Sequence, residues 1–130
     1  MSVSPLNWFT GSSKTPESRY GDITMITQEG DRRCEYNKIN GIDVSDTEVA
    51  CIDGLCIVFN RNMLESDIKF NEDMMFNCYD TYISLSAIMK YHFKVGVMVL
   101  PTIHQSVGKS ILSDVFMQDE NILRSNFIFS

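Results

Sequence analysis

The fold is decided largely by residues 79–108, which read YDTYISLSAIMKYHFKVGVMVLPTIHQSVG. The first part, Tyr79 to His92, is long enough for a helix and carries few charges, so we expect a helix that is covered on most sides. The next part, Lys94 to Leu100, is apolar on both faces, which is typical of a buried parallel strand, and Pro101 should end it. A loop over residues 102–108 should follow.

Three further segments, on both sides of this stretch, have patterns that predict a strand or a helix. Residues 23–27 alternate and are β-branched, which predicts a short strand. Residues 49–59, VACIDGLCIVF, are strongly strand-like, either as one bulged strand or as a type I′ hairpin that turns at Asp53-Gly54. After a plausible cap at Ser110, apolar residues recur at intervals of three, four and seven up to Phe127, which predicts a closing amphipathic helix.

Size and charge exclude several classes of protein. With 130 residues, 44% of them apolar, the chain is long enough for one packed domain, which we place at residues 23–130 after a loop-rich segment at 1–22. The net charge of −6 disfavours nucleic acid as a partner. The longest uncharged stretch, residues 95–108, is too short to span a bilayer, and no leader pattern is seen. We therefore expect a cytoplasmic protein without a transmembrane segment.

The four cysteines, Cys34, Cys51, Cys56 and Cys78, show no CxxC spacing, so neither a zinc knuckle nor a redox pair is indicated. If Cys51 and Cys56 lay on one extended strand, they would face opposite sides and be roughly 16 Å apart, beyond the reach of a disulfide. We expect buried free thiols.

Two groups of residues are candidates for chemistry, and each has an ordinary structural interpretation as well. His104 follows the end of the expected buried strand, where open α/β sheets place their ligand clefts, but a loop histidine is commonly structural or solvated. Glu72 and Asp73 lie just before Asp80 in the sequence, and carboxylates near a cleft can act as general bases. They can equally be solvated charges, and Asp80, in the first turn of a helix, can be a capping residue.

The order of several short motifs resembles the C-terminal half of family-2-like glycosyltransferases of the GT-A fold. The resemblance covers nearly the whole chain, from about Trp8 and the Gly21 to Ile23 segment through the final helix. Its motifs, in order, are Asp53-Gly54, Phe70-Asn71-Glu72, Tyr79-Asp80 before Ile83-Ser84-Leu85, Lys94-Val95-Gly96-Val97, and His104-x-Ser106-x-Gly108. The fold class that this resemblance implies is α/β, a partial GT-A-like mixed sheet with two main helices.

The resemblance also implies roles for individual residues. Asp80 occupies the position of the general base that deprotonates the acceptor hydroxyl for inverting attack on a nucleotide sugar. His104 matches a histidine that contacts the metal or the diphosphate. Acceptor binding would fall to the remaining motif residues, which are Asp53, Gly54, Glu72 and Tyr79. A divalent metal, Mn²⁺ or Mg²⁺, is the cofactor implied.

The chain departs from the family pattern in several places. Asn71 stands where the family usually has aspartate, and Ser86 stands where a basic residue often follows the leucine of the helix. The N-terminal nucleotide-binding half is missing, and the chain contains no D-x-D motif for the metal. We therefore expect the isolated chain to be inactive.

Two classes of function follow from these observations. The first is the acceptor-side half of a glycosyltransferase, and the second is a non-catalytic binding or interaction module that retains the half-fold. A half-fold leaves a strand edge and apolar surface exposed, so we expect self-association or a partner chain. Because the expected helix and strand run antiparallel, we also expect Asp80, His104 and Gly54 to face one cleft.

Overall fold

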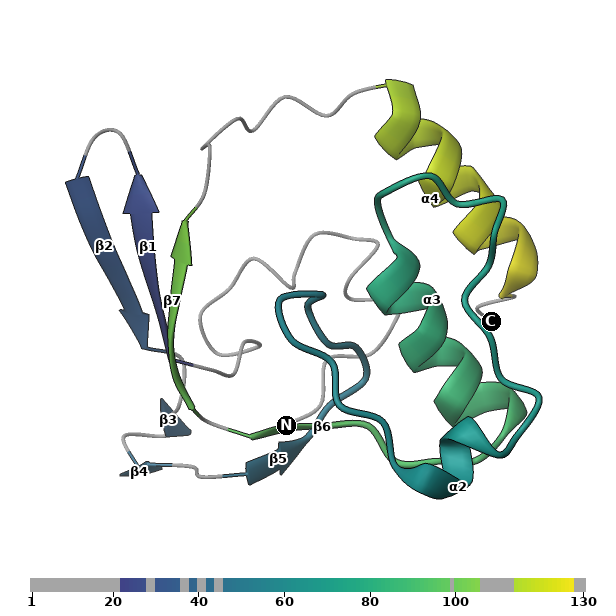
Figure 1. Cartoon of the computed structure of the whole chain (residues 1–130), viewed down its shortest axis with the longest axis horizontal. Helices are drawn as coiled ribbons and strands as arrows, with labels where there is room; N and C mark the ends of the chain where they lie inside the picture. The colour runs from purple at the N-terminus through teal and green to yellow at the C-terminus, as the bar shows by residue number, and fades with distance from the viewer. Residues whose placement is uncertain are drawn as a thin grey trace. The chain divides into compact units, whose positions relative to one another are not determined.

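The computed structural model describes residues 22–27, 30–35, 38–39, 42–43, 46–98, 100–105 and 114–127. In these ranges the chain contains both helices and strands, which confirms the mixed α/β class (Figure 1). It divides into two compact units. The first, here called the strand unit, comprises Met1–Val49 and Gly96–Ser110, and the second, the helix unit, comprises Ala50–Val95 and Ile111–Ser130.

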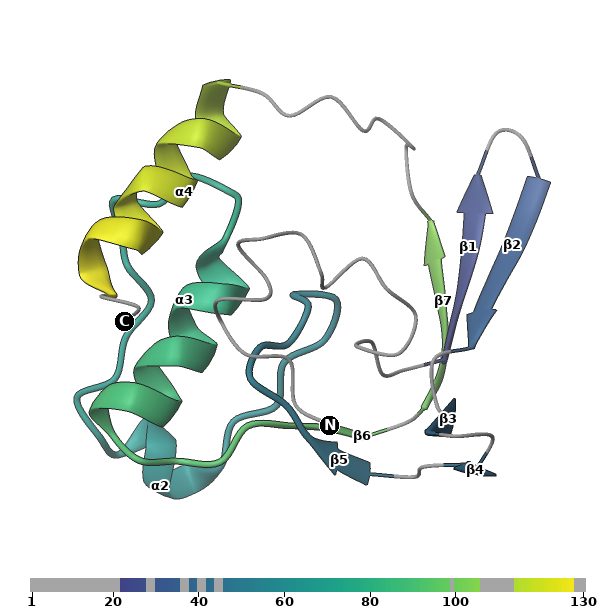
Figure 2. The same cartoon turned by 180° about the vertical axis from the view of Figure 1, so that it is seen from behind.

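The strand unit contains a mixed three-stranded sheet in the order β2-β1-β7. Strand β1 (Asp22–Thr27) pairs antiparallel with β2 (Gly30–Glu35) and parallel with β7 (Pro101–Gln105), as Figure 2 shows from behind. The predicted strand at residues 23–27 is confirmed. In the parallel pair, Met25 lies opposite His104, so this histidine is part of a strand and not of the loop that we expected.

Two short antiparallel pairs complete the described part of the strand unit. They are β3 (Lys38–Ile39) with β4 (Ile42–Asp43), and β5 (Asp46–Glu48) with β6 (Gly96–Met98). The prediction of a buried parallel strand over residues 94–100 is wrong. Among the residues described there, Gly96–Met98 form β6, which is antiparallel to β5, and Gly96 and Met98 are exposed. Pro101 begins β7 instead of ending a strand. The first residue of a strand at a sheet edge is a place where a missing N–H is tolerated.

Residues 49–59 form neither the bulged strand nor the hairpin that we predicted. They follow an irregular path with a turn at Gly54 and Leu55. Their backbone amides bond to side chains of the following helix instead of to a strand: the Ile52 amide donates to Ser84 Oγ at 3.3 Å, and the Gly54 amide donates to Asp80 Oδ2 at 2.9 Å. These side chains offer the backbone an alternative to a ladder, which overrides the β-propensity of the run.

The helix unit is built from helices and the irregular segments between them. Its elements are α2 (Arg61–Leu64), α3 (Tyr79–Leu85), the π-helical turn η3 (Ser86–Lys90) and α4 (Asp114–Asn126). Because η3 continues α3 without a break, these two elements together confirm the helix predicted at residues 79–92, which ends at Lys90. The two main helices that we expected are therefore present.

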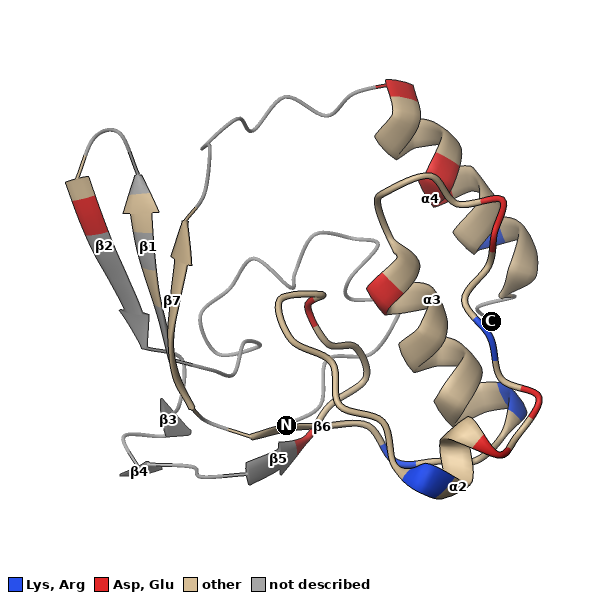
Figure 3. Ribbon diagram, viewed as in Figure 1, with Lys and Arg blue, Asp and Glu red and all other residues tan. Residues whose placement is uncertain are grey.

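The helix formed by α3 and η3 is covered over much of its length, as its sparse charges suggested. Ile83, Leu85 and Ala87 are all buried, and in Figure 3 α3 is tan beyond its first turn, where its acidic residue Asp80 lies. After η3 the chain turns at His92, which has a positive φ of 57°, and the Phe93 amide donates to the Ala87 carbonyl at 2.8 Å. This left-handed residue after the last turn is a common helix ending.

Helix α4 confirms the closing amphipathic helix. Its Leu123 and the following Phe127 are buried in the core, and the ring of Phe127 lies edge-on to Tyr82 of α3 with the centroids 5.4 Å apart. The cap predicted at Ser110 lies outside the described residues, as do the loop-rich segment up to residue 21 and the Trp8, Gly21, Ser106 and Gly108 positions of the resemblance.

The cysteines of the helix unit are free thiols, as expected. Cys78 is buried and Cys51 is half-buried, but Cys56 is exposed, so the expectation of burial is wrong for Cys56. Its position in the irregular 49–59 segment explains this, because that segment has no regular strand or helix with one face turned toward the core. The prediction for Cys34 falls on a side chain outside those that the structure describes.

Candidate functional site

The carboxylate of Asp80 lies at the first turn of α3 and joins this helix to the turn at Gly54. Asp80 Oδ2 accepts a hydrogen bond from the Gly54 amide at 2.9 Å, and Oδ1 accepts from the Thr81 amide at 2.7 Å. The second bond satisfies one of the free N–H groups at the start of the helix, so the capping interpretation of Asp80 is confirmed. The first bond is a tertiary contact between residues 26 positions apart.

Tyr79 closes the other side of the turn. Its hydroxyl donates to the Gly54 carbonyl at 3.4 Å, and its ring centroid lies 6.1 Å from that of Phe70. A Cβ atom at Gly54 would overlap the Tyr79 hydroxyl and lie 2.7 Å from its Cζ. The close approach of this ring therefore requires glycine at position 54. Asp53, Gly54, Tyr79 and Asp80 meet in one place, which we call the Asp80 corner.

The surroundings of the Asp80 side chain raise the pKa of its carboxyl group above the usual value. Burial raises the pKa of Asp80, the hydrogen bonds from the Thr81 and Gly54 amides lower it, and the charge of Asp53 raises it again, with a net increase. Burial and the nearby Asp80 charge also raise the pKa of Cys51 and of Cys78 to about 12, with smaller contributions from Asp119 and Glu120 at Cys78. Both thiols are therefore protonated at neutral pH.

This arrangement suits general-base chemistry. Asp80 is half-buried, and Asp53 beside it is exposed. A carboxylate whose pKa is raised by its surroundings is a stronger proton acceptor than a free one. The hydrogen bonds from Gly54 and Thr81 fix the orientation of its two oxygens.

The other predicted site residues lie elsewhere. Glu72 is exposed on the segment before α3, next to Asp73, and lines a separate pocket with Tyr82. His104 lies on β7 in the strand unit. Of the expected convergence of Asp80, Gly54 and His104, the contact between Asp80 and Gly54 is confirmed by their hydrogen bond. The part that concerns His104 stays a prediction.

Asp119 is an important residue that the sequence analysis missed. Its side chain is completely buried, and it accepts hydrogen bonds from the amides of Met75, Phe76 and Asn77 at 3.0, 3.2 and 2.8 Å. It thereby holds the segment that leads into α3. A signal was present, because Asp119 is four residues from both Val115 and Leu123 and so lies on the apolar face of the closing helix. An unpaired carboxylate is almost never buried there.

Ser84 was also not singled out. Its hydroxyl donates to the Asp80 carbonyl at 2.6 Å and accepts from the Ile52 amide. It is buried, and it ties the segment before Gly54 to the same helix that carries Asp80. Two side chains one turn apart on α3 therefore hold the irregular segment in place.

The described residues do not form a site that fits the implied divalent cation. Within the ranges that the structure describes, no group of three or more His, Cys, Asp and Glu side chains is placed to hold a metal ion. The sequence has no D-x-D motif. We therefore derive no step through a metal on this chain.

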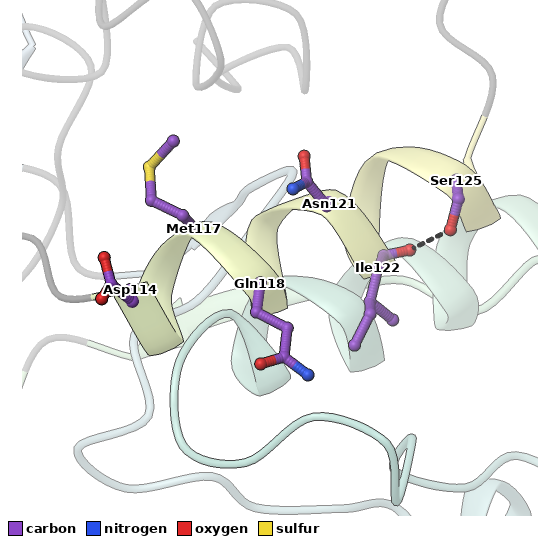
Figure 4. A pocket seen from close by; sticks show the side chains of 6 residues that line it. All are labelled: Asp114, Met117, Gln118, Asn121, Ile122 and Ser125. Atoms are coloured by element: carbon purple, nitrogen blue, oxygen red, sulfur yellow. Dashed lines mark hydrogen bonds between the residues drawn. The ribbon is translucent and has the colours of Figure 1, made fainter.

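A hollow of about 540 Å³ lies along α4, and no residue of the Asp80 corner is among the described residues that line it (Figure 4). The described residues that line it all come from one helix, and they are Asp114, Met117, Gln118, Asn121, Ile122 and Ser125. Among them, the Ser125 hydroxyl donates to the Ile122 carbonyl at 2.8 Å. These mostly uncharged side chains do not converge on one point, so we assign no chemistry to this hollow.

No protein-family model matches the chain, and no match is found among curated proteins or among solved structures. None of the helices in the described ranges is long and apolar enough to cross a membrane. The function must therefore be argued from the Asp80 corner and from the order of the sequence motifs.

Replacing Gly54 by alanine is expected to displace the Tyr79 ring and lower the free energy of unfolding by about 1–3 kcal/mol, the usual cost of overpacking. The backbone at Gly54 is not the cause, because among the described glycines only Gly30 has a positive φ. The measurement is a double-mutant cycle in urea with Gly54→Ala, Tyr79→Ala and the double variant. We expect Gly54→Ala to cost little in the Tyr79→Ala background, and an equal cost in both backgrounds would contradict the overlap.

Proposed function

We propose that this chain is the acceptor-side half of an inverting, nucleotide-sugar-dependent glycosyltransferase, with Asp80 as the general base. The observation that carries the proposal is the hydrogen bond between the Gly54 amide and Asp80 Oδ2. In the order of motifs that resembles family-2-like glycosyltransferases, these two residues belong to separate motifs. Their contact in the folded chain supports a common role, although the same geometry also serves the structure.

The proposed reaction uses groups of the Asp80 corner in defined roles. One Asp80 oxygen accepts the proton of an acceptor hydroxyl while that hydroxyl oxygen forms a bond to the anomeric carbon of the donor sugar. The bond from the anomeric carbon to the nucleoside diphosphate breaks, and the diphosphate leaves with the electron pair. Attack from the side opposite the leaving group inverts the configuration. Asp53, Gly54 and Tyr79 would line the acceptor side, where the missing side chain of Gly54 lets a ring approach the backbone.

The nucleotide-binding part and the metal would come from a separate half in this proposal. The contact with the diphosphate or the metal is the role that the resemblance assigns to His104. The test is a transfer assay on the complete gene product, with UDP- and GDP-sugars, Mn²⁺ and a glycan array as acceptors. NMR of the product anomer reads the stereochemistry. We expect transfer with inversion, and retention of configuration would contradict the role of Asp80.

A non-catalytic interaction module is the second candidate, and the exposure of Met75 and Phe76 favours it. These side chains are 70% and 76% exposed, although the backbone beneath them is held by Asp119. Apolar side chains presented from a fixed backbone are suited to a partner protein or to self-association. An absence of transfer in the complete gene product, together with a stable dimer by ultracentrifugation, would favour this candidate.

The chain of 130 residues by itself is expected to bind nucleotide sugars only weakly. It has no D-x-D motif, and its described residues hold no cluster suited to a metal. Isothermal titration calorimetry with UDP-glucose and GDP-mannose, with and without Mn²⁺, measures this. Metal-dependent micromolar binding by the chain alone would mean that it contains a complete donor site.

A further inference from the structure

A pocket of about 290 Å³ lies beside α3 and η3 in the helix unit and is not part of the Asp80 corner. This volume is close to the lower end of the range for small-molecule sites, which is about 300 Å³. The pocket, which we call the Tyr91 pocket, is lined on one side by the segment before α3 and on the other by the helix. Its uncharged lining includes Phe70, Asn71, Tyr82, Ser86 and Tyr91, and its charged lining consists of Asp67, Lys69, Glu72 and Lys90.

Ser86 is an unusual residue in the lining of the Tyr91 pocket. It is only 3% exposed, and its hydroxyl has no hydrogen-bond partner among the residues that the structure describes. Most buried hydroxyls are paired, because leaving one unpaired costs free energy. The Ser84 hydroxyl, two residues earlier on the same helix, shows the usual solution by donating to the Asp80 carbonyl. An unpaired buried hydroxyl in a pocket indicates a polar ligand.

Tyr91 is a second lining residue that can make further contacts with a ligand. It is half-buried, and neither its ring nor its hydroxyl has a partner within the described ranges. The neighbouring Tyr82 differs, because its ring is packed against Phe127 and lies 5.5 Å from Lys90 Nζ. The ring of Tyr91 is therefore free to stack on a ligand.

The charges that line the Tyr91 pocket are balanced. Asp67 and Glu72 contribute two carboxylates, and Lys69 and Lys90 contribute two ammonium groups. Lys90 is held over the Phe127 ring at 4.9 Å, while no ion pair joins any of these four charged groups to another described residue. A lining of both signs disfavours a simple anion or cation, whose charge would meet a like charge. It suits a neutral ligand that both donates and accepts hydrogen bonds.

Aromatic rings connect the Tyr91 pocket to the Asp80 corner. Phe70 lines the pocket, and its ring centroid lies 6.1 Å from that of Tyr79, whose hydroxyl contacts Gly54. One aromatic contact therefore joins the lining of the pocket to the Asp80 corner.

We propose that the Tyr91 pocket binds one sugar ring of an oligosaccharide acceptor, as a second saccharide subsite beyond the Asp80 corner. A sugar presents a C–H face, which is attracted to the electron-rich face of an aromatic ring such as Tyr91. Its hydroxyls can pair with the Ser86 hydroxyl, the Asn71 amide and the Glu72 carboxylate. The chemical class is a neutral glycan. The placement of the subsite on the acceptor rests on the proposed function, whereas saccharide binding by the pocket can be tested without transfer.

The experiment is an amide NMR titration of the full chain with maltose, cellobiose, lactose and N,N′-diacetylchitobiose at millimolar concentrations. Inorganic phosphate and free lysine serve as charged probes. We expect at least one of the disaccharides to shift the amides of residues 69–72 and 86–91, with saturation. The charged probes should leave these amides unchanged.

Two variants separate binding from folding. Tyr91→Ala should weaken saccharide binding about tenfold, the effect of removing one aromatic stacking partner. Ser86→Ala should weaken it by a smaller factor, of about threefold, while the melting temperature stays equal or rises, because an unpaired buried hydroxyl is removed. If Ser86 had only a structural role, its replacement would not weaken saccharide binding while the melting temperature stayed equal or rose. Phe76→Ala is the matched aromatic control, since Phe76 is exposed and does not line the pocket. The saccharide affinity of this variant should be unchanged.

Several outcomes would overturn the proposal. They are the absence of shifts with every disaccharide, shifts that persist with the same affinity in Tyr91→Ala and Ser86→Ala, or a stronger response to phosphate or lysine. Its failure is distinguishable from failure of the proposed function. If transfer depends on Asp80 but no saccharide shifts the amides at the pocket, only the subsite proposal is contradicted. If the pocket binds saccharide but the complete gene product transfers no sugar, only the catalytic role is contradicted.

Discussion

Replacing Asp119 by alanine is expected to unfold the helix unit or to lower its free energy of unfolding by more than about 3 kcal/mol. The carboxylate is completely buried and accepts hydrogen bonds from three successive backbone amides, those of Met75, Phe76 and Asn77. Without it, these three part-buried amides would lose the one carboxylate that pairs with all of them. Domains of this size are stable by only about 5–15 kcal/mol, so the loss is a large fraction of the total.

Urea denaturation followed by circular dichroism measures this effect. Asp114→Ala is the matched control, because Asp114 is an exposed acidic residue on the same helix and contributes at most about 1 kcal/mol through the helix dipole. Asp119→Asn keeps one acceptor oxygen and should fall between the two. A stability of Asp119→Ala equal to that of Asp114→Ala would contradict the structural role of these hydrogen bonds.

The stabilisation by Asp119 should also depend on pH. Burial alone would raise the pKa of Asp119, but the hydrogen bonds from Asn77, Met75 and Phe76 outweigh it and lower the pKa below its usual value. The folded state therefore favours the ionised form, so this stabilisation is present above the pKa of the unfolded chain, about 4, and is lost as the pH falls through the folded value. In Asp119→Asn this part of the acid dependence should be missing.

Replacing Asp80 by asparagine is expected to lower the rate of glycosyl transfer by about 10²–10⁴-fold, which is the usual contribution of a general base. Asparagine keeps the size of the side chain and one acceptor oxygen for the Gly54 or Thr81 amide but cannot take a proton. The measurement is kcat/KM in the transfer assay on the complete gene product, with circular dichroism to confirm that the fold is kept. Transfer by Asp80→Asn at the rate of the unchanged protein would exclude Asp80 as the base.

Asp53→Asn tests how the charge of Asp53, the adjacent exposed carboxylate of the same corner, acts on Asp80. The pKa of Asp80 is raised mainly by burial and further by the charge of Asp53. Removing that charge should move the acid limb of the pH–rate profile for kcat to lower pH, separately from any change in KM at the acceptor side. An unchanged profile would mean that the two carboxylates do not interact.

The raised pKa of Asp80 has the opposite consequence for stability from that of Asp119. Because the folded state favours the protonated form, the stability that Asp80 contributes is full below the pKa of the unfolded chain. It is lost as the pH rises through the higher folded value. Asp80→Asn should not lose stability in this range. A site that keeps a partly buried charge at a cost in stability is typical of function.

Much of the regular structure could be predicted from local patterns. The helix at residues 79–92, the closing helix up to Phe127 and the strand at 23–27 were all predicted, because helical and strand periodicities are properties of neighbouring residues. The position of Asp80 in the first turn and its capping bond to Thr81 belong to the same local level. The sequence also showed an acidic residue, Asp119, on the apolar face of the closing helix, but it did not show which amides this residue binds.

The tertiary structure alone decided where the apolar runs at 49–59 and 94–100 would go. Both have strand-like composition. In the first, the amides of Ile52 and Gly54 donate to side chains of α3. In the second, three of the described residues pair with β5. Pairing partners are chosen by the path of the whole chain, and β-propensity measures only how well a residue fits if a partner is present. For the same reason, the contacts of Asp80 with Gly54 and of Asp119 with residues 75–77, which join positions 26 and 42 to 44 apart, could be read only from the folded chain.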